Sequence, residues 1–165
     1  MAEKKDPAYR IGMGYDVHPF AERRPLILGG MTIPYHQGLA GHSDADCLVH
    51  AICDALLGAI SAGDLGSHFP DSDPRYKDVE SLLLLKKVVE MAERKGFRIA
   101  NIDATIVAQA PQLAPYRVQM EEKIAQTVGV VHGRVNVKAT TTEGLGFAGR
   151  GEGIAAYAVV LVEKR

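Results

Sequence analysis

Apolar residues recur along the chain with two different spacings, and the order of these spacings restricts the possible folds more than any other feature. The apolar-rich run at residues 9–18 predicts a strand, which we expect to end where Pro19 removes a backbone donor. Two short apolar runs at residues 26–28 and 31–33 flank a double glycine, a pattern typical of a tight β-hairpin. The chain is thus expected to begin with β-structure.

Helical spacing governs three later segments. An Ala- and Leu-rich run without proline extends to about residue 60, and Ser43 or Asp44 is a suitable N-cap for a helix there. Residues 81–95 carry an apolar stripe at helical spacing. Residues 116–128 follow a proline that can open a helix and precede a glycine that can end it.

Three further strands are predicted at residues 97–109, 134–139 and 153–162. The resulting order of helices and strands lacks the regular βαβ alternation of a doubly wound fold. We therefore expect an α+β fold, in which a mixed β-sheet has helices packed on one face and a β-hairpin is added. Residues 9–165 are expected to form a single domain after a disordered lead-in at residues 1–8.

Composition argues against several classes of protein. A formal net charge of −1 over 165 residues gives no reason to expect nucleic acid or an anionic membrane as partner. The chain has no apolar run of transmembrane length, and residues 2–6 lack the apolar core of a signal peptide. Cys47 and Cys53 fall on different faces of the first predicted helix, too far apart for a disulfide. We therefore expect a reduced, cytoplasmic protein.

Asp16 and His18 are the first candidate site residues. On a strand, side chains two residues apart share a face, so this carboxylate and imidazole are expected to project side by side. Asp46, His50 and Asp54 are spaced four residues apart and share one face of the first predicted helix. Asp16, His18 and His50 together offer a donor set that suits Zn²⁺ and leaves one position open for a substrate oxygen.

Alternatives are open at this candidate metal site. His42, Asp46 and His50 could instead form a site on the helix alone. For any one of Asp46, His50 and Asp54, a solvent-exposed polar face is the simplest interpretation. If His50 binds the metal, Asp46 or Asp54 is the expected acceptor for its other ring nitrogen.

Two loops carry groups suited to phosphate or to a polar ligand. Residues 138–143, Lys-Ala-Thr-Thr-Thr-Glu, offer hydroxyl groups, backbone N–H groups and a carboxylate that suits Mg²⁺, although threonines also simply favour strands. The Gly-, Pro- and Asp-rich segment at residues 63–74 fits ordinary turns and a flexible lid equally well. The chain has no Walker-type phosphate loop and no Ser-His-Asp triad motif.

Seven motifs, taken in order, resemble those of a single family. They are Gly14-Tyr15-Asp16-Val17-His18, His42-Ser43-Asp44, Asp54-Ala55-Leu56-Leu57-Gly58, Gly63-Asp64-Leu65-Gly66, Phe69-Pro70-Asp71, Ala108-Gln109-Ala110-Pro111, and Lys138-Ala139-Thr140-Thr141-Thr142-Glu143 through Gly151-Glu152-Gly153. The chain resembles the 2-C-methyl-D-erythritol 2,4-cyclodiphosphate synthases over residues 10–162.

This resemblance implies a homotrimer with active sites between neighbouring subunits, each holding one Zn²⁺ and one Mg²⁺ or Mn²⁺. It implies a phosphorus-oxygen lyase of non-mevalonate isoprenoid biosynthesis. The expected reaction converts 4-diphosphocytidyl-2-C-methyl-D-erythritol 2-phosphate into 2-C-methyl-D-erythritol 2,4-cyclodiphosphate and CMP. The substrate's own 2-phosphate attacks its β-phosphate, so no protein nucleophile is required.

The resemblance also assigns roles by position. Asp16, His18 and His50 match the zinc ligands, and Glu143 matches the Mg²⁺ ligand. His42 and Thr141 match the catalytic residues that position phosphate. The residues matching contacts with the erythritol part are Ser43, Asp64, Leu65, Gly66, Phe69, Pro70, Asp71, Ser72 and Asp73. Those matching the cytidine and diphosphate pocket are Ala108, Gln109, Ala110, Pro111, Gln112, Leu113, Ala114, Thr140, Thr141, Thr142 and Glu143.

Three further positions bear on a ligand near the trimer axis and on contacts with the nucleotide. Phe147 and Arg150 match residues near the trimer axis, where family members can hold an isoprenoid diphosphate. Gln112 stands where some relatives carry lysine, which removes a cation near the nucleotide.

Two other functions are open from the residues alone: a metal-dependent phosphohydrolase acting on a nucleotide diphosphate, and a non-catalytic trimer that binds isoprenoid diphosphates.

Overall fold

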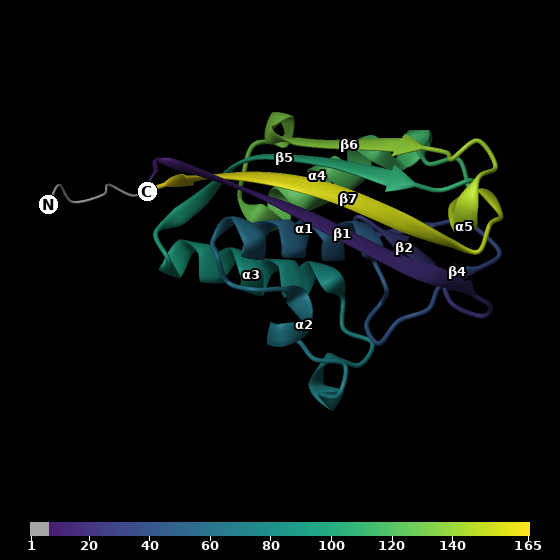
Figure 1. The fold of residues 1–165 in the computed structure, drawn as a ribbon. Helices are drawn as coiled ribbons and strands as arrows, with labels where there is room; N and C mark the ends of the chain where they lie inside the picture. Colours follow the sequence, from purple (N-terminus) through teal and green to yellow (C-terminus); the bar gives the residue numbers. More distant parts are fainter. Residues whose placement is uncertain (1–6) are drawn as a thin grey trace, which may run out of the picture.

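The computed structural model describes residues 7–165, and its elements follow the predicted order (Figure 1). The strands are β1 (Tyr9–Ala21), β2 (Leu26–Leu28), β3 (Met31–Ile33), β4 (Gly38–Leu39), β5 (Phe97–Val107), β6 (Val135–Thr140) and β7 (Gly153–Lys164). The α-helices are α1 (Cys47–Ala59), α2 (Leu65–His68), α3 (Ser81–Arg94), α4 (Arg117–Val128) and α5 (Gly146–Gly149). Short 3₁₀ turns are η1 (Pro74–Tyr76), η2 (Ala114–Tyr116) and η3 (His132–Arg134).

A five-stranded sheet with the order β4-β1-β7-β5-β6 forms one layer of the molecule. β5 and β6 run parallel, whereas the other neighbouring strands run antiparallel, so the sheet is mixed. Helices α1, α3 and α4 lie on one face of it (Figure 1). The expected α+β fold, with helices on one face of a mixed sheet, is therefore confirmed. Within the described residues, none of these helices is long and apolar enough to cross a membrane.

The predicted hairpin is confirmed as the two-stranded sheet of β2 and β3. Gly29 and Gly30 have φ angles of +58° and +71°. A two-residue hairpin turn of type I′ needs positive φ at both positions, which glycine adopts without steric cost.

Of the lead-in expected at residues 1–8, residues 1–6 lie outside the described part of the chain. Pro7 and Ala8 are exposed and precede β1 directly. The carbonyl of Ala8 accepts a hydrogen bond from the N–H of Lys164 (2.9 Å).

The prediction that the first strand ends at His18 is wrong, because β1 continues through Pro19 to Ala21. Pro19 stands opposite Gly153 of β7, and its carbonyl accepts a hydrogen bond from the N–H of Ala40 (2.9 Å). Proline still offers this acceptor, and its fixed φ is compatible with extended backbone, so pairing persists beyond it.

The predicted start of the first helix is also wrong. Helix α1 begins at Cys47, and its N-cap is Asp46, whose carboxylate accepts from the N–H of Val49 (3.1 Å). Asp44 instead accepts a hydrogen bond from the N–H of Ser81 (2.9 Å), the first residue of α3. Both carboxylates act at helix starts, as their residue type favours, but they serve two different helices.

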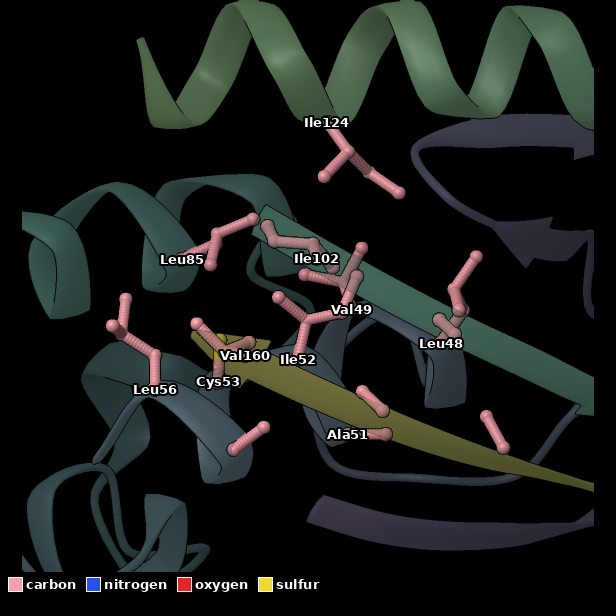
Figure 2. Close-up of a cluster of buried hydrophobic side chains, with 14 of the residues drawn as sticks. Leu48, Val49, Ala51, Ile52, Cys53, Leu56, Leu85, Ile102, Ile124 and Val160 are labelled. Carbon is pink, nitrogen blue, oxygen red and sulfur yellow. The ribbon is translucent and has the colours of Figure 1, made fainter. Parts of the chain in front are cut away.

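Helix α1 lies at the centre of the hydrophobic core. Figure 2 shows its side chains among residues of α3, α4, β5 and β7: Leu48, Val49, Ile52 and Leu56 of α1 with Leu85, Ile124, Ile102 and Val160. Cys47 and Cys53 are buried in this core as free thiols, as expected.

Two glycines of β1 allow α1 to lie directly against the strand. A Cβ atom at Gly12 would lie 2.0 Å from the carbonyl oxygen of Ala55, and one at Gly14 would lie 1.9 Å from that of Ala51. Real Cβ atoms essentially never come within 3.0 Å of such neighbours. Only glycine therefore permits β1 and α1 to lie this close together. Gly14, the second of these glycines, is two residues before Asp16.

Replacing Gly14 with alanine is expected to lower the free energy of unfolding by about 1–3 kcal/mol, because the new Cβ must displace α1. Chemical denaturation at fixed protein concentration measures this change. Gly58→Ala is the matched control on α1, since its Cβ would meet no atom closer than 4.0 Å and alanine favours a helix over glycine. Equal stability of Gly14→Ala and the unchanged chain would contradict the close contact.

Candidate functional site

Asp16, His18 and His50 converge between β1 and α1. Asp16 Oδ2 lies 2.9 Å from His18 Nε2 and 3.0 Å from His50 Nδ1, and these two ring nitrogens are 3.2 Å apart. Within residues 7–165, this is the one group of three His, Cys, Asp or Glu side chains arranged to hold a metal ion. The predicted cluster is thus brought together by the fold.

The local sequence explains this convergence. Asp16 and His18 are half-buried on the face of β1 that meets α1, whereas the intervening Val17 is exposed on the other face. His50 is buried near the start of α1 and precedes Ala51, whose carbonyl oxygen lies against Gly14. The close contact of helix and strand therefore sets how near the imidazole of His50 comes to the strand.

Charge interactions within the cluster shift two pKa values. Burial raises the pKa of Asp16, but hydrogen bonds with His18 and His50 outweigh it and lower this pKa to about 2. Burial lowers the pKa of His18, but the hydrogen bond and charge of Asp16 reverse the effect and raise it overall. Asp16 is therefore an anion at neutral pH, and the centre of the cluster favours a positive charge.

The other nitrogen of each imidazole is also held. His18 Nδ1 donates to the carbonyl of Ala40 (2.6 Å), because a carbonyl can only accept. In the neutral ring this leaves a lone pair on Nε2, and Nε2 donates to Asp16 only when the ring carries a second proton. His50 Nε2 lies 2.8 Å from Ser81 Oγ and 3.1 Å from Ser43 Oγ.

The expectation that Asp46 or Asp54 holds this nitrogen of His50 is wrong. Asp46 is buried and accepts from the N–H groups of Gly29 (3.0 Å) and Gly30 (2.7 Å) as well as capping α1. Asp54 accepts from the N–H of Leu65 (2.7 Å). Asp46 and Asp54 do lie one helical turn on either side of His50. Both carboxylates, however, accept hydrogen bonds from backbone N–H groups of other segments instead.

The donor atoms suit a small divalent cation. Tetrahedral zinc with bonds of about 2.0–2.2 Å places its donor atoms roughly 3.3 Å apart, close to the separations found here. Calcium, with bonds of about 2.3–2.6 Å and six to eight oxygen ligands, fits poorly. Two imidazoles and one carboxylate with an open position are typical of a catalytic rather than a structural zinc site.

A cavity of about 380 Å³ opens beside the cluster. Besides the three donors, its lining comprises Gly41, His42, Ser43, Asp54, Leu65, Gly66, Phe69 and Asp71. Six of these, His42, Ser43, Leu65, Gly66, Phe69 and Asp71, were predicted site residues. Asp64, Pro70, Ser72 and Asp73 were also predicted but do not line it.

His42 belongs to the cavity wall rather than to α1. It precedes the first residue of the helix, and its Nε2 is 3.2 Å from the carbonyl oxygen of Asp73. The alternative metal site on the helix alone, formed by His42, Asp46 and His50, is therefore wrong.

The loop beside this cavity consists of structured turns. Asp64 caps α2 by accepting from the N–H of Ser67 (2.8 Å), and Asp73 caps η1. Phe69 packs edge-on against Tyr76 with their ring centroids 5.2 Å apart, and the Lys87 ammonium lies over both rings. Turn chemistry thus accounts for the composition of residues 63–74.

A second cavity, of about 210 Å³, lies where β5 and β6 end. Its lining comprises Ala108, Gln109, Pro111, Gln112, Leu113, Ala114, Ala139, Thr140 and Thr141, nearly all of them predicted for the cytidine and diphosphate pocket. Ala110, Thr142 and Glu143, also predicted, do not line it. Thr142 lines a smaller cavity with Phe147, and Arg150 pairs with Glu152 (2.8 Å).

Glu143 adjoins this second cavity in a distinctive conformation. Its φ of +54° lies in the left-handed region, which a non-glycine residue adopts only at some cost. Thr141 Oγ1 is 3.2 Å from both the carboxylate Oε1 and the backbone N of Glu143. The hydroxyl group therefore holds this carboxylate beside the end of β6.

The two cavities share no residue and lie toward opposite edges of the sheet. Strands β7 and β5 separate β1 from β6, which at about 4.7–4.9 Å per step puts the two strands roughly 14 Å apart. The chain thus presents two separate groups of predicted site residues.

Sequence reasoning missed Gly41, the carbonyl of Ala40 and Ser81, because their contacts depend on packing between distant segments.

Known proteins resemble this chain over most of its length. The sequence model of the YgbB family matches residues 9–163. A 2-C-methyl-D-erythritol 2,4-cyclodiphosphate synthase of Syntrophobacter fumaroxidans is 63% identical over 153 residues, covering 93% of this chain and 96% of that protein. The synthase of Syntrophomonas wolfei subsp. wolfei is 61% identical over 155 residues, covering 94% and 99%.

Solved structures show the same fold. The bifunctional IspDF of Campylobacter jejuni superposes with a TM-score of 0.92 at 43% identity, covering 95% of this chain and 42% of that one. The CDP complex of IspF from Plasmodium falciparum superposes with a TM-score of 0.85 at 29% identity, covering 98% and 99%. The chain therefore belongs to the YgbB family of 2-C-methyl-D-erythritol 2,4-cyclodiphosphate synthases, lyases of the non-mevalonate isoprenoid pathway.

Proposed function

We propose that this chain converts 4-diphosphocytidyl-2-C-methyl-D-erythritol 2-phosphate into 2-C-methyl-D-erythritol 2,4-cyclodiphosphate and CMP, with Asp16, His18 and His50 as its zinc ligands. The observation that carries the proposal is the three-donor cluster beside the 380 Å³ cavity. Family membership supports the substrate, and the solved relative with bound CDP supports a cytidine nucleotide as part of it.

The side chains position the substrate rather than attack it. The nucleophile is the substrate's 2-phosphate, which is already an anion, so the reaction requires alignment and relief of charge repulsion. Zn²⁺ at the cluster, and Mg²⁺ or Mn²⁺ at Glu143, would polarise the phosphoryl oxygens and offset their negative charge. His42 and Ser43 line the cavity beside the cluster and would orient phosphate, whereas Thr141 would do so from the second cavity.

The second cavity would hold the cytidine and the diphosphate. Ala108, Leu113 and Ala114 give it an apolar wall that suits a nucleobase, and Thr140 and Thr141 add hydroxyl groups suited to phosphate. Gln112 offers an amide in this wall, so recognition there would rely on hydrogen bonds rather than on a cation. Asp64 and residues 69–73 would contact the erythritol part.

A homotrimer would bring the two cavities of different chains together. Two observations support it: the separation of the cavities within one chain, and the uncovered apolar face of the sheet. On that face Ile11 and Met13 are 68% and 65% exposed, and Tyr15 packs against Tyr157. Continuous exposed apolar surface usually marks an interface. Phe147 and Arg150 would then lie near the trimer axis, where an isoprenoid diphosphate could bind.

We also propose that residues 9–165 act as one domain and that the protein is cytoplasmic. The single sheet that runs from Tyr9 to Lys164 supports the first point. The two buried, free thiols fit a reducing compartment.

Phosphorus NMR of the products tests the reaction directly. We expect the purified protein with Zn²⁺ and Mg²⁺ to release CMP and form the cyclic diphosphate from the proposed substrate, because an intramolecular phosphate outcompetes water when both are aligned. A zinc chelator should abolish turnover, and added Zn²⁺ should restore it. Formation of a linear diphosphate or of monophosphates would instead identify a hydrolase and contradict the proposal.

Replacing His50 with alanine is expected to remove zinc and most of the turnover while the assembly persists, since the remaining two donors cannot hold the ion. Elemental analysis, CMP release and size-exclusion chromatography measure the three properties. His36→Ala is the matched control, because His36 is exposed, packs at a tilt against Tyr35 and does not line the cavity beside the cluster. Retained zinc and near-normal CMP release in His50→Ala would contradict the assignment.

A further inference from the structure

Ser81 lies directly against the candidate metal cluster without being a ligand. It is the first residue of α3, is completely buried, and its Oγ lies 2.8 Å from His50 Nε2. The same Oγ donates a hydrogen bond to Asp44 Oδ1, and the N–H of Ser81 donates to Asp44 Oδ2 (2.9 Å). The Asp44 carboxylate therefore holds Ser81 with both of its oxygens.

The positions of the protons follow from this arrangement. A serine hydroxyl group has one proton, and the Asp44 carboxylate can only accept, so the proton of Ser81 lies between these two oxygens. Ser81 Oγ can then only accept from His50, whose Nε2 must carry the ring proton. The neutral ring has one proton, so Asp44 and Ser81 hold it at Nε2 against a competing acceptor, Asp16 Oδ2, which lies 3.0 Å from Nδ1. Nδ1 then keeps its lone pair, which faces Asp16 and His18. This is the tautomer that can bind a metal through Nδ1.

Ser43 does not determine the tautomer by itself. Its Oγ lies 3.1 Å from His50 Nε2 and accepts from the N–H of Ala45 (3.2 Å). Among residues 7–165, no hydrogen bond commits its own proton to another acceptor, so this hydroxyl group can either donate to His50 or accept from it. The Ser81 hydroxyl group lacks that freedom because of Asp44.

We propose that Asp44 and Ser81 are positioning residues that fix the Nε2–H tautomer of His50 and thereby prepare Nδ1 as a metal ligand. The metal part of this inference rests on the proposed function, whereas the tautomer does not. Asp44 precedes α1 and Ser81 begins α3, so docking of α3 against the start of α1 would also prepare the metal site.

The tautomer can be read in the metal-free protein by ¹⁵N NMR of the His50 ring, at a pH where the ring is neutral. We expect a protonated Nε2 in the unchanged chain and in Ser81→Thr, which keeps the hydroxyl group. Ser81→Ala removes the acceptor and should give a mixture of tautomers. The Ser43→Ala control should keep Nε2 protonated.

Zinc affinity, measured by competition with a chromogenic chelator, is the second readout. We expect Ser81→Ala to weaken zinc binding about 10- to 100-fold and Ser81→Thr to restore it, as for other hydrogen-bonding partners of metal-bound histidines. An unprotonated Nε2 in the unchanged chain, or an unchanged tautomer in Ser81→Ala, overturns the inference. Absence of zinc binding by the unchanged chain would contradict the proposed function, while the NMR result would still decide the roles of Asp44 and Ser81.

Discussion

The contact between α1 and β1 at Gly12 and Gly14 is the constraint on which the rest of the structure depends. Any side chain larger than hydrogen at these positions would collide with the carbonyl oxygens of α1, so the spacing of helix and strand is fixed. His50 lies on the helix beside this contact, and Asp16 follows it on the strand. Their donor atoms consequently meet 3.0 Å apart, a separation that suits two ligands of a small cation.

The remaining segments stabilise this contact and complete its surroundings. Asp46 caps α1 and accepts from both glycines of the hairpin, so one buried carboxylate attaches β2 and β3 to the start of the helix. Burial raises the pKa of Asp46 to about 6, against the effect of these N–H donors. Ser81 connects α3 to His50 in the same region. The second cavity, at the ends of β5 and β6, lies outside this group of contacts, which is why one chain presents two separated parts of the proposed active site.

Periodicity predicted the elements well, and local spacing predicted part of the site. Asp16 and His18 share a face because strand geometry alone requires it, and Ile99 and Ile102 depart from alternation because β5 has a bulge there. The partners of His50 could not be predicted, since Ser81 reaches it only after α3 has packed against α1. Asp46 fits the expected helix face, but its role depends on where the helix begins and on the distant hairpin. The donor set of Asp16, His18 and His50 was thus predicted across two elements, whereas the hydrogen-bond partners that other segments supply to these residues were not predictable.

Activity of mixed assemblies tests most directly the claim that two chains complete one site. His50→Ala disables the metal cluster, and Glu143→Gln disables the carboxylate beside the second cavity. Chains carrying these changes, with different affinity tags, can be coexpressed and the doubly tagged assemblies isolated. In a cyclic trimer each mixed assembly has one interface with both intact parts, so the account predicts roughly one third of the unchanged activity. Mixed assemblies as inactive as either variant alone would contradict a site shared between chains.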